Sequence, residues 1–154
     1  MKKMDFDEAI KHLGDISDSV NPKLEKGMKL VCAKIVSDIQ ESMSKTPRDT
    51  GKSYFRNNKR IPHHPSMPGN PPAPDTGNLR RSIRFRVENK DYEVNGKVGS
   101  TQTNPPYGAY LEYGYVLNGK AVPPRPWLHP AMENNKEFMK ETFKTVIQSS
   151  LKGK

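Results

Sequence analysis

The residues best suited to chemistry in this sequence are four arginines that lie close together. They are Arg80, Arg81, Arg84 and Arg86. Guanidinium groups bind phosphate and carboxylate oxygens through paired hydrogen bonds. The alternation over residues 83–88 predicts a half-buried strand with Arg84 and Arg86 on one face and Phe85 on the other, where we expect Phe85 to join the core. Three alternatives stay open: the arginines line a passage for the DNA backbone, pair with acids of an adjacent subunit, or form only a solvated strand face.

Residues 45–74 are a second candidate for contacts with an anionic partner. The first half of this segment is basic, and residues 61–74 contain six prolines. Proline-rich chain is stiff and extended, so we expect one long irregular arm that reaches to a neighbouring molecule. The cations that we assign to a DNA channel or an acidic partner are Arg48, Lys52, Arg56, Lys59 and Arg60, together with the four arginines above.

Residues that could support catalysis or hold a metal do not form a known pattern. His63 and His64 are adjacent, so in extended chain they point in opposite directions, and no CxxC or HExxH motif completes a metal site. Lys52 belongs to a Gly-Lys-Ser triplet, but the preceding glycine of a phosphate-binding loop is missing. Cys32 lies beside an apolar helical stripe and is expected to be a small buried hydrophobe. We therefore predict no enzyme activity and no cofactor or metal.

The composition indicates a small core and an anionic partner. Only 32% of the residues are hydrophobic, and 14 of the 154 are proline. Peripheral segments are then expected to order only when another molecule packs on them. The net charge of +9 favours nucleic acid, an anionic membrane or an acidic protein surface as a partner, or it serves solubility alone. No apolar run is long enough for a membrane span, and the first residues do not form a signal peptide.

The pattern of helices and strands predicts an α+β fold in a single domain over residues 1–154. Residues 4–44 are expected to be helical, in two helices: a weak one over 4–18 and a longer one that starts at Asn21-Pro22. The longer helix has an apolar stripe formed by Leu24, Met28, Val31, Ile35, Ile39 and Met43, and Thr46-Pro47 ends it. The basic, proline-rich arm (45–74) follows, and residues 75–151 are expected to hold a small antiparallel sheet and a long C-terminal helix.

Within residues 75–151, several shorter elements are predicted. One or two helical turns precede the arginine strand, and residues 89–91 form a turn. The next segment forms one strand, or two short strands broken at Asn95-Gly96. Periodicity does not decide between helix and strand for residues 107–113. Residues 121–130 are expected to be extended because they contain four prolines, and one helix is expected over about 130–151.

Aromatic residues are dense between residues 107 and 127. This density, beside Arg125 and several prolines, is typical of an interface with rigid anchors, although the rings could instead complete a thin core. Four motifs occur in order through this half of the chain. They are Asp75-Thr76-Gly77-Asn78-Leu79-Arg80-Arg81-Ser82-Ile83, Val98-Gly99-Ser100, Tyr107-Gly108-Ala109-Tyr110-Leu111-Glu112-Tyr113-Gly114 and Pro124-Arg125-Pro126-Trp127-Leu128-His129-Pro130-Ala131.

This order and spacing resemble those of the neck, head–tail joining and tail-completion proteins of long-tailed bacteriophages, which include minor tail proteins of the gp-ten-like type. The resemblance covers residues 75–150. Gly108 stands where the pattern usually has alanine, and Trp127 stands where it usually has phenylalanine. The resemblance implies a subunit or partner interface formed by Asp75, Thr76, Gly77, Leu79, Tyr107, Tyr110, Glu112, Tyr113, Gly114, Arg125, Pro126 and Trp127.

The resemblance also implies a structural virion protein, made in the host bacterial cytoplasm, that joins the DNA-filled head to the tail or completes the proximal tail. It implies a homo-oligomeric ring of six or twelve copies. The implied partners are a head-completion or stopper protein, the tail terminator and the tail tube, with packaged DNA in the channel and no membrane. The alternatives from the residues alone are a basic nucleic-acid-binding module without catalysis, a small enzyme, or a toxin-like or regulatory protein.

Overall fold

The computed structural model describes residues 6–49, 54–55, 62–90, 93–101 and 107–151. Its elements confirm the predicted α+β class: a long N-terminal helix, small antiparallel sheets and a C-terminal helix. The helices are α1 (Phe6–Lys45), α2 (Asn78–Ser82), α3 (Tyr107–Tyr113), α4 (His129–Asn134) and α5 (Lys136–Leu151). The strands are β1 (Tyr54–Phe55), β2 (Pro62–His63), β3 (Ile83–Lys90), β4 (Glu93–Ser100), β5 (Tyr115–Leu117) and β6 (Lys120–Val122), paired as three two-stranded sheets.

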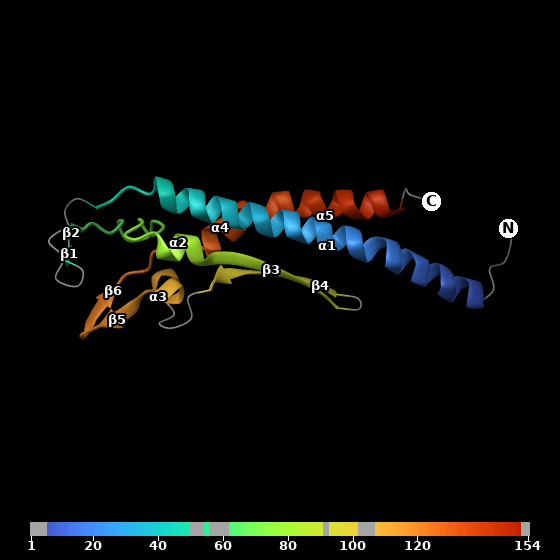
Figure 1. The fold of residues 1–154 in the computed structure, drawn as a ribbon, viewed down its shortest axis with the longest axis horizontal. Helices are drawn as coiled ribbons and strands as arrows, with labels where there is room; N and C mark the ends of the chain where they lie inside the picture. Colours follow the sequence, from blue (N-terminus) through green and yellow to red (C-terminus); the bar gives the residue numbers. More distant parts are fainter. Residues whose placement is uncertain (1–5, 50–53, 56–61, 91–92, 102–106, 152–154) are drawn as a thin grey trace.

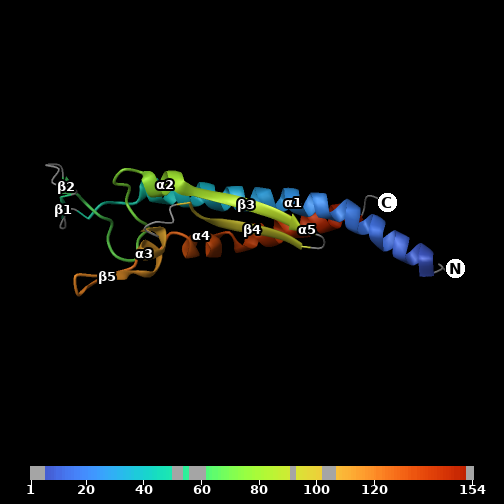
Figure 2. The same ribbon diagram turned by 60° about the horizontal axis from the view of Figure 1, so that its bottom comes forward.

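The molecule is elongated because its elements lie along one helix. The β3–β4 hairpin and α5 both run beside α1, and the termini lie at the same end (Figures 1 and 2). The short sheets β1–β2 and β5–β6 lie at the opposite end. Among the described residues, no helix has both the length and the apolar character needed to cross a bilayer.

Helix α1 is continuous over 40 residues, so the prediction of two helices was wrong. Pro22, which was expected to start a second helix, lies inside α1 on an exposed position. A proline inside a helix removes one hydrogen bond and costs about 3 kcal/mol. Contacts between α1 and α5 begin just after the proline, where the Lys23 Nζ donates to the Ser149 carbonyl at 3.3 Å. A Cβ at Gly27 would lie 3.1 Å from Val146, so α1 and α5 approach closely there.

The predicted apolar stripe of α1 forms the core. Val31, Ile35, Ile39 and Met43 are at most 2% exposed, and they pack with Ile83, Leu79, Leu111 and Trp127. Burial of such side chains stabilises the fold by roughly 1.5–3 kcal/mol each. Cys32 is buried beside this stripe, as predicted, and burial raises the pKa of its thiol.

Strands β3 and β4 form one long hairpin, so the segment after residues 89–91 is one strand and not two short strands. Asn95-Gly96 lies inside β4 rather than at a turn, with Gly96 opposite Val87. A Cβ at Gly96 would lie 2.6 Å from the sulfur atoms of Met28 and Cys32, so glycine lets the hairpin approach α1.

Phe85 was expected in the core, but it is 40% exposed. It shares a face of the hairpin with Ile83, which is fully buried. The sheet has only two strands, so β3 has an open edge, and no described element lies beyond it to cover the ring.

The segment 45–74 is not wholly irregular. Strand β1 pairs with β2, and Arg48 forms a β-bridge with Ser66, so the described parts of the arm fold back on one another. The Asp49 amide donates to the Pro65 carbonyl at 2.6 Å. The prediction missed this ladder because prolines and short runs give no clear period.

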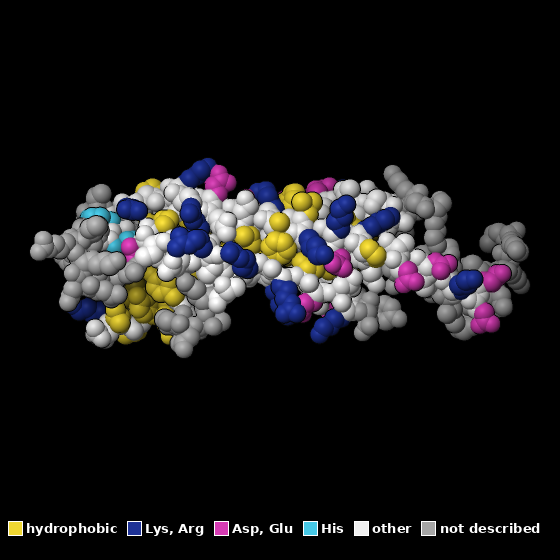
Figure 3. Space-filling view, in the orientation of Figure 1, with side chains coloured by type: hydrophobic (Ala, Val, Ile, Leu, Met, Phe, Trp, Pro, Cys, Tyr) yellow, Lys and Arg dark blue, Asp and Glu magenta, His cyan; other side chains and the backbone are white. Residues whose placement is uncertain are grey.

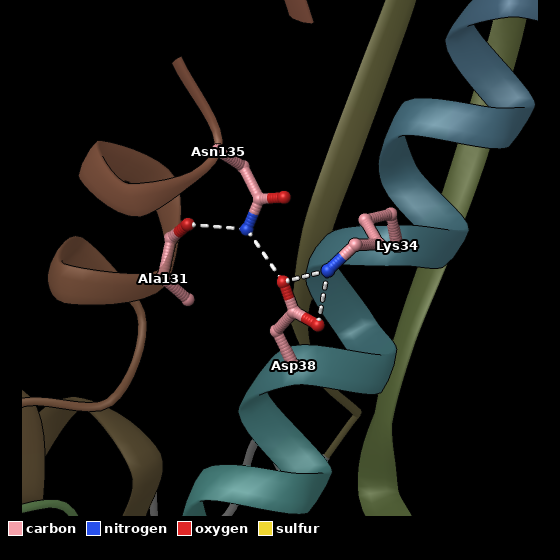
Figure 4. A network of polar contacts seen from close by, with 4 residues as sticks. All are labelled: Lys34, Asp38, Ala131 and Asn135. Carbon is pink, nitrogen blue, oxygen red and sulfur yellow. Dashed lines mark hydrogen bonds and ion pairs between the residues drawn. The ribbon is translucent and has the colours of Figure 1, made fainter. Parts of the chain in front are cut away.

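The single C-terminal helix predicted over 130–151 is divided at Asn135. This residue leaves helical geometry at φ −100° and ψ 3°. Its side-chain amide donates to the Ala131 carbonyl and to the Asp38 carboxylate, both at 2.9 Å (Figure 4). Lys34 also donates to Asp38 at 2.6 Å. This network joins α1 to the junction of α4 and α5.

The Asp38 carboxylate should stabilise the fold in a pH-dependent way. Burial alone would raise its pKa, but the hydrogen bonds from Lys34 and Asn135 and the charge of Lys34 outweigh burial and hold the pKa below its ordinary value of 3.8. The stabilisation is therefore complete above that value and is lost as pH falls through the lower, folded-state pKa.

We expect Asp38→Asn to lower the free energy of unfolding by about 1 kcal/mol at pH 7. The difference from wild type should shrink as the pH is lowered below about 4. Urea unfolding at several pH values measures both effects. Glu141→Gln, at an exposed position of α5, is the control and should change stability by less than about 0.5 kcal/mol. A pH-independent loss for Asp38→Asn would contradict this explanation.

Candidate subunit interface

A short hairpin at the end of the molecule opposite the termini presents apolar side chains to solvent. Strands β5 and β6 are joined by Asn118 and Gly119, which have φ of 50° and 74°. Two positive-φ residues in a two-residue loop fit the twist of a hairpin. The sequence analysis missed this hairpin, although the Asn-Gly dipeptide between two short runs is a recognised hairpin signal.

Several exposed apolar residues lie on α3 and on the β5–β6 hairpin, and this group is here called the hairpin patch. It consists of Tyr107, Tyr110, Tyr113, Val116 and Leu117, which are 41%, 42%, 82%, 71% and 54% exposed. Figure 3 shows apolar side chains gathered over this end of the molecule. Large exposed apolar patches mark interaction sites in soluble proteins. The three tyrosines among the predicted interface residues are therefore available for contacts with a partner.

A groove adjoins the hairpin patch. Its volume is about 1350 Å³, and its walls come from residues 72–80, α3 and the β5–β6 hairpin. Leu79 and Leu111 contribute apolar wall, and both are part of the core. The predicted interface residues Asp75, Thr76 and Gly77 also line it. Gly77 has φ of 72°, and it precedes α2.

Glu112 holds this end of the molecule together from inside. Its carboxylate accepts hydrogen bonds from the backbone amides of Trp127, Leu128 and His129 at 2.7, 2.9 and 2.9 Å. These amides lie at the start of α4, where helix N–H groups have no partner in the helix and a negative charge is favourable. The residue is 8% exposed, so it acts within the chain and positions the loop that leads into α4.

Trp127 is also inside the chain, at 5% exposure. Its indole N–H donates to the Gly108 carbonyl at 2.9 Å. A Cβ at Gly108 would lie 3.1 Å from the Trp127 ring. The two departures from the phage pattern are therefore in contact: glycine makes room for a ring larger than phenylalanine.

Arg125 links the base of the arm to α3. The Arg125 Nε donates to the Ser66 carbonyl at 2.9 Å, and its backbone amide donates to the Leu111 carbonyl at 2.6 Å. Pro126 is half-buried beside it. Gly114 has φ of 77°, and a Cβ there would lie 2.8 Å from the Val122 carbonyl oxygen. These predicted interface residues therefore shape the hairpin and the groove rather than project from them.

Some of the cations that were predicted to contact DNA or an acidic partner donate hydrogen bonds within the chain, and others are exposed. Arg80 donates to the Ser44 hydroxyl at 2.5 Å, and Arg81 donates to the Asn78 side chain at 2.6 Å. Arg84 and Arg86 are exposed on β3, and Arg86 forms an ion pair with Glu88 at 3.2 Å. Arg48 donates to the Pro74 carbonyl at 3.3 Å. Lys52, Arg56, Lys59 and Arg60 lie outside the described residues.

His63, considered above for metal binding, lies 3.6 Å from the Asp75 carboxylate through its Nδ1. Within the described ranges, no three His, Cys, Asp or Glu side chains come close enough together to hold a metal ion. The described residues at this end place apolar side chains beside a few charges.

Comparison with known protein families supports the resemblance to phage tail proteins. A model of the family described as "Bacteriophage HK97-gp10, putative tail-component" matches residues 5–114, which is 110 of the 154 residues. The match includes the motifs around residues 75–83 and 107–114, and it stops before β5. Searches of curated proteins and of solved structures gave no significant match.

We expect Glu112→Gln to lower the free energy of unfolding by about 1–3 kcal/mol, because an amide keeps one oxygen acceptor but loses the charge that three backbone N–H groups share. Chemical denaturation monitored by the fluorescence of Trp127 measures the change. Glu141→Gln, at an exposed position of α5, is the matched control and should stay close to wild type. Equal stability of the two variants would show that the cluster of hydrogen bonds at Glu112 is dispensable.

Proposed function

The chain belongs to the HK97-gp10-like family of bacteriophage tail components, and on that premise we propose that it joins the DNA-filled head to the tail or completes the proximal end of the tail. This family is structural and non-enzymatic. Its members are components of the phage virion, so the partners of the chain include other virion proteins. The neck proteins named above, namely stopper, terminator and tail tube, are the partners that we assign within this proposal.

The observation that carries the proposal is the hairpin patch. The chain has few apolar residues, yet it leaves Tyr113, Val116 and Leu117 more than half exposed at one end. Aromatic anchors in such a position are typical of the centre of a protein–protein interface. The hydrogen bonds of Glu112 and Arg125 hold the patch on a rigid base, which reduces the entropy lost on binding. A ring of six or twelve copies is the assembly proposed here.

The arm at residues 45–74 is proposed to contact a neighbouring molecule. Its described base is tied to the body by the Arg48 contact with Pro74 and by the Gly69 amide, which donates to the Pro124 carbonyl at 3.0 Å. A fixed base and a proline-rich sequence favour a stiff projection over a flexible tail.

We expect Val116→Asp to abolish assembly, because it places a charge on an apolar residue of the hairpin patch that is 71% exposed, without disturbing the core. Light scattering of the purified protein and electron microscopy of particles from the phage that encodes it are the measurements. Ile147→Asp, at an apolar position of α5 that is 48% exposed, is the control and should assemble normally. Heads and tails that join normally with Val116→Asp would contradict the role of the patch. The patch is a cleaner target than Trp127, because Trp127→Ala would also damage the core.

The exposed arginines of β3 favour a second candidate function, contact with DNA. Arg84 and Arg86 lie on the exposed face of the hairpin, and Lys97 stands opposite Arg86. A basic strand face of this kind can contact the phosphate backbone without reading sequence.

If these arginines bind DNA, Arg84→Ala with Arg86→Ala should weaken binding and reduce the slope of log K against log salt by about 2. Fluorescence anisotropy with duplex DNA at several salt concentrations measures this slope. Lys140→Ala with Lys144→Ala removes the same charge from α5 and serves as the control. An equal change in both variants would assign the effect to net charge rather than to the β3 face.

A further inference from the structure

The N-terminal part of α1 projects beyond the rest of the molecule. Helix α5 ends beside Lys23, and the β3–β4 hairpin reaches Glu25, to which the Asn89 side chain donates at 3.1 Å. The helix continues past both of them toward the N-terminus (Figures 1 and 2). A Cβ at Gly14 would meet no atom within 4 Å. Residues 6–19 therefore form a projecting helix about 20 Å long.

The charge of this projection is opposite to that of the chain. Its acids are Asp7, Glu8, Asp15 and Asp18, all exposed, and its lysine is Lys11. Figure 3 shows acidic side chains gathered on the projection, while lysines and arginines dominate the body in the same view. The sequence of this segment has the spacing of a weak amphipathic helix, with apolar residues at steps of four and three: Phe6, Ile10, Leu13 and Ile16. An acidic, amphipathic helix needs a partner surface that is apolar and cationic.

The groove beside the hairpin patch has this chemistry. Its walls include apolar side chains from the core and the hairpin, among them Leu79, Leu111 and Leu117. Among the described residues that line it, the cations are Arg80, Lys120 and Arg125, and the carboxylate is that of Asp75. A helix about 10 Å across occupies roughly 400 Å³ per turn, so the groove has room for about three turns.

We infer that the projecting end of α1 from one copy of the chain docks into the groove of a second copy. The projection cannot occupy the groove of its own chain, because α1 is one continuous helix that leads away from it toward the other end of the molecule. Site and occupant are different surfaces, so the contact is head-to-tail and can repeat around a closed ring. This inference rests on the proposed function and names the contact that builds the ring.

The test is a charge exchange in the full chain. One variant carries Asp15→Lys with Asp18→Lys, and the other carries Lys120→Glu. Each alone should weaken self-association about tenfold, because the first variant sets lysines against a cationic groove and the second replaces a groove cation by a carboxylate. A mixture of the two variants should recover association, since each projection then faces a groove of opposite charge. Sedimentation velocity at low and high salt measures association, and salt should weaken the wild-type contact.

A cross-linking experiment identifies the contact directly. Asp15→Cys and Lys120→Cys are made in separate chains, mixed and treated with a short bismaleimide. Cys32 is buried, and its raised pKa slows its reaction. The expected product is a covalent dimer joined between positions 15 and 120.

Glu137→Lys and Lys144→Glu on α5 are the controls for the charge exchange, and they should associate as wild type does.

Failure of association to recover in the mixture, absence of the 15–120 product, or a product joined between two copies of position 15 would overturn the inference. The proposed function would still stand if Val116→Asp blocks the joining of heads and tails. A 15–120 product together with normal particles from Val116→Asp would support the contact and count against the proposed role of the hairpin patch. The tests of the 15–120 contact and the Val116→Asp test of the proposed function can therefore fail separately.

Discussion

Packing against one face of α1 is the interaction on which the rest of the structure depends. The chain has few apolar residues, and the stripe that includes Val31, Ile35 and Ile39 concentrates them along a line. A linear stripe can be covered only by elements that run beside it, which are the β3–β4 hairpin on one side and α5 on the other. The molecule is therefore long, and its two ends lie far apart. The hairpin remains a two-stranded sheet with open edges, and the exposure of Phe85 is a direct result.

Buried polar groups add to apolar packing at the end of the molecule that carries the hairpin patch. Glu112 satisfies three amides at the start of α4, and Arg125 joins the arm, the β6 loop and α3. Each lies within a short run that also contains exposed aromatic or aliphatic residues. The interface residues implied by the phage resemblance therefore have two roles. Some, such as Glu112, are buried and hold this end of the fold together, and others, such as Tyr113, are exposed on it. This division explains how a chain with a thin core can display a rigid apolar surface.

Several elements could be predicted from the sequence because their signals are local. The stripe of α1, the helix end at Thr46-Pro47, the turns of α2 and the strand at residue 83 follow from periodicity and from proline. Three of the errors occur where contacts distant in sequence override a local signal. Pro22 remains inside α1 because α5 packs just beyond it, and Gly96 lies in a strand because Met28 and Cys32 occupy the space of a side chain. Asn135 interrupts the last helix because its side chain bonds to Asp38, 97 residues away in sequence.

The sequence by itself determined the α+β class, the main buried face and, through its ordered motifs, the phage tail family that the matched family model supports. Those properties depend on the type and spacing of neighbouring residues, which the sequence contains in full. Only the tertiary structure decided which residues of these motifs and of the hairpin that follows them are exposed. Glu112 and Trp127 are buried while Tyr113 and Val116 are open to solvent, although all four lie within one short stretch. Exposure depends on what packs from elsewhere in the chain, and no local pattern records it.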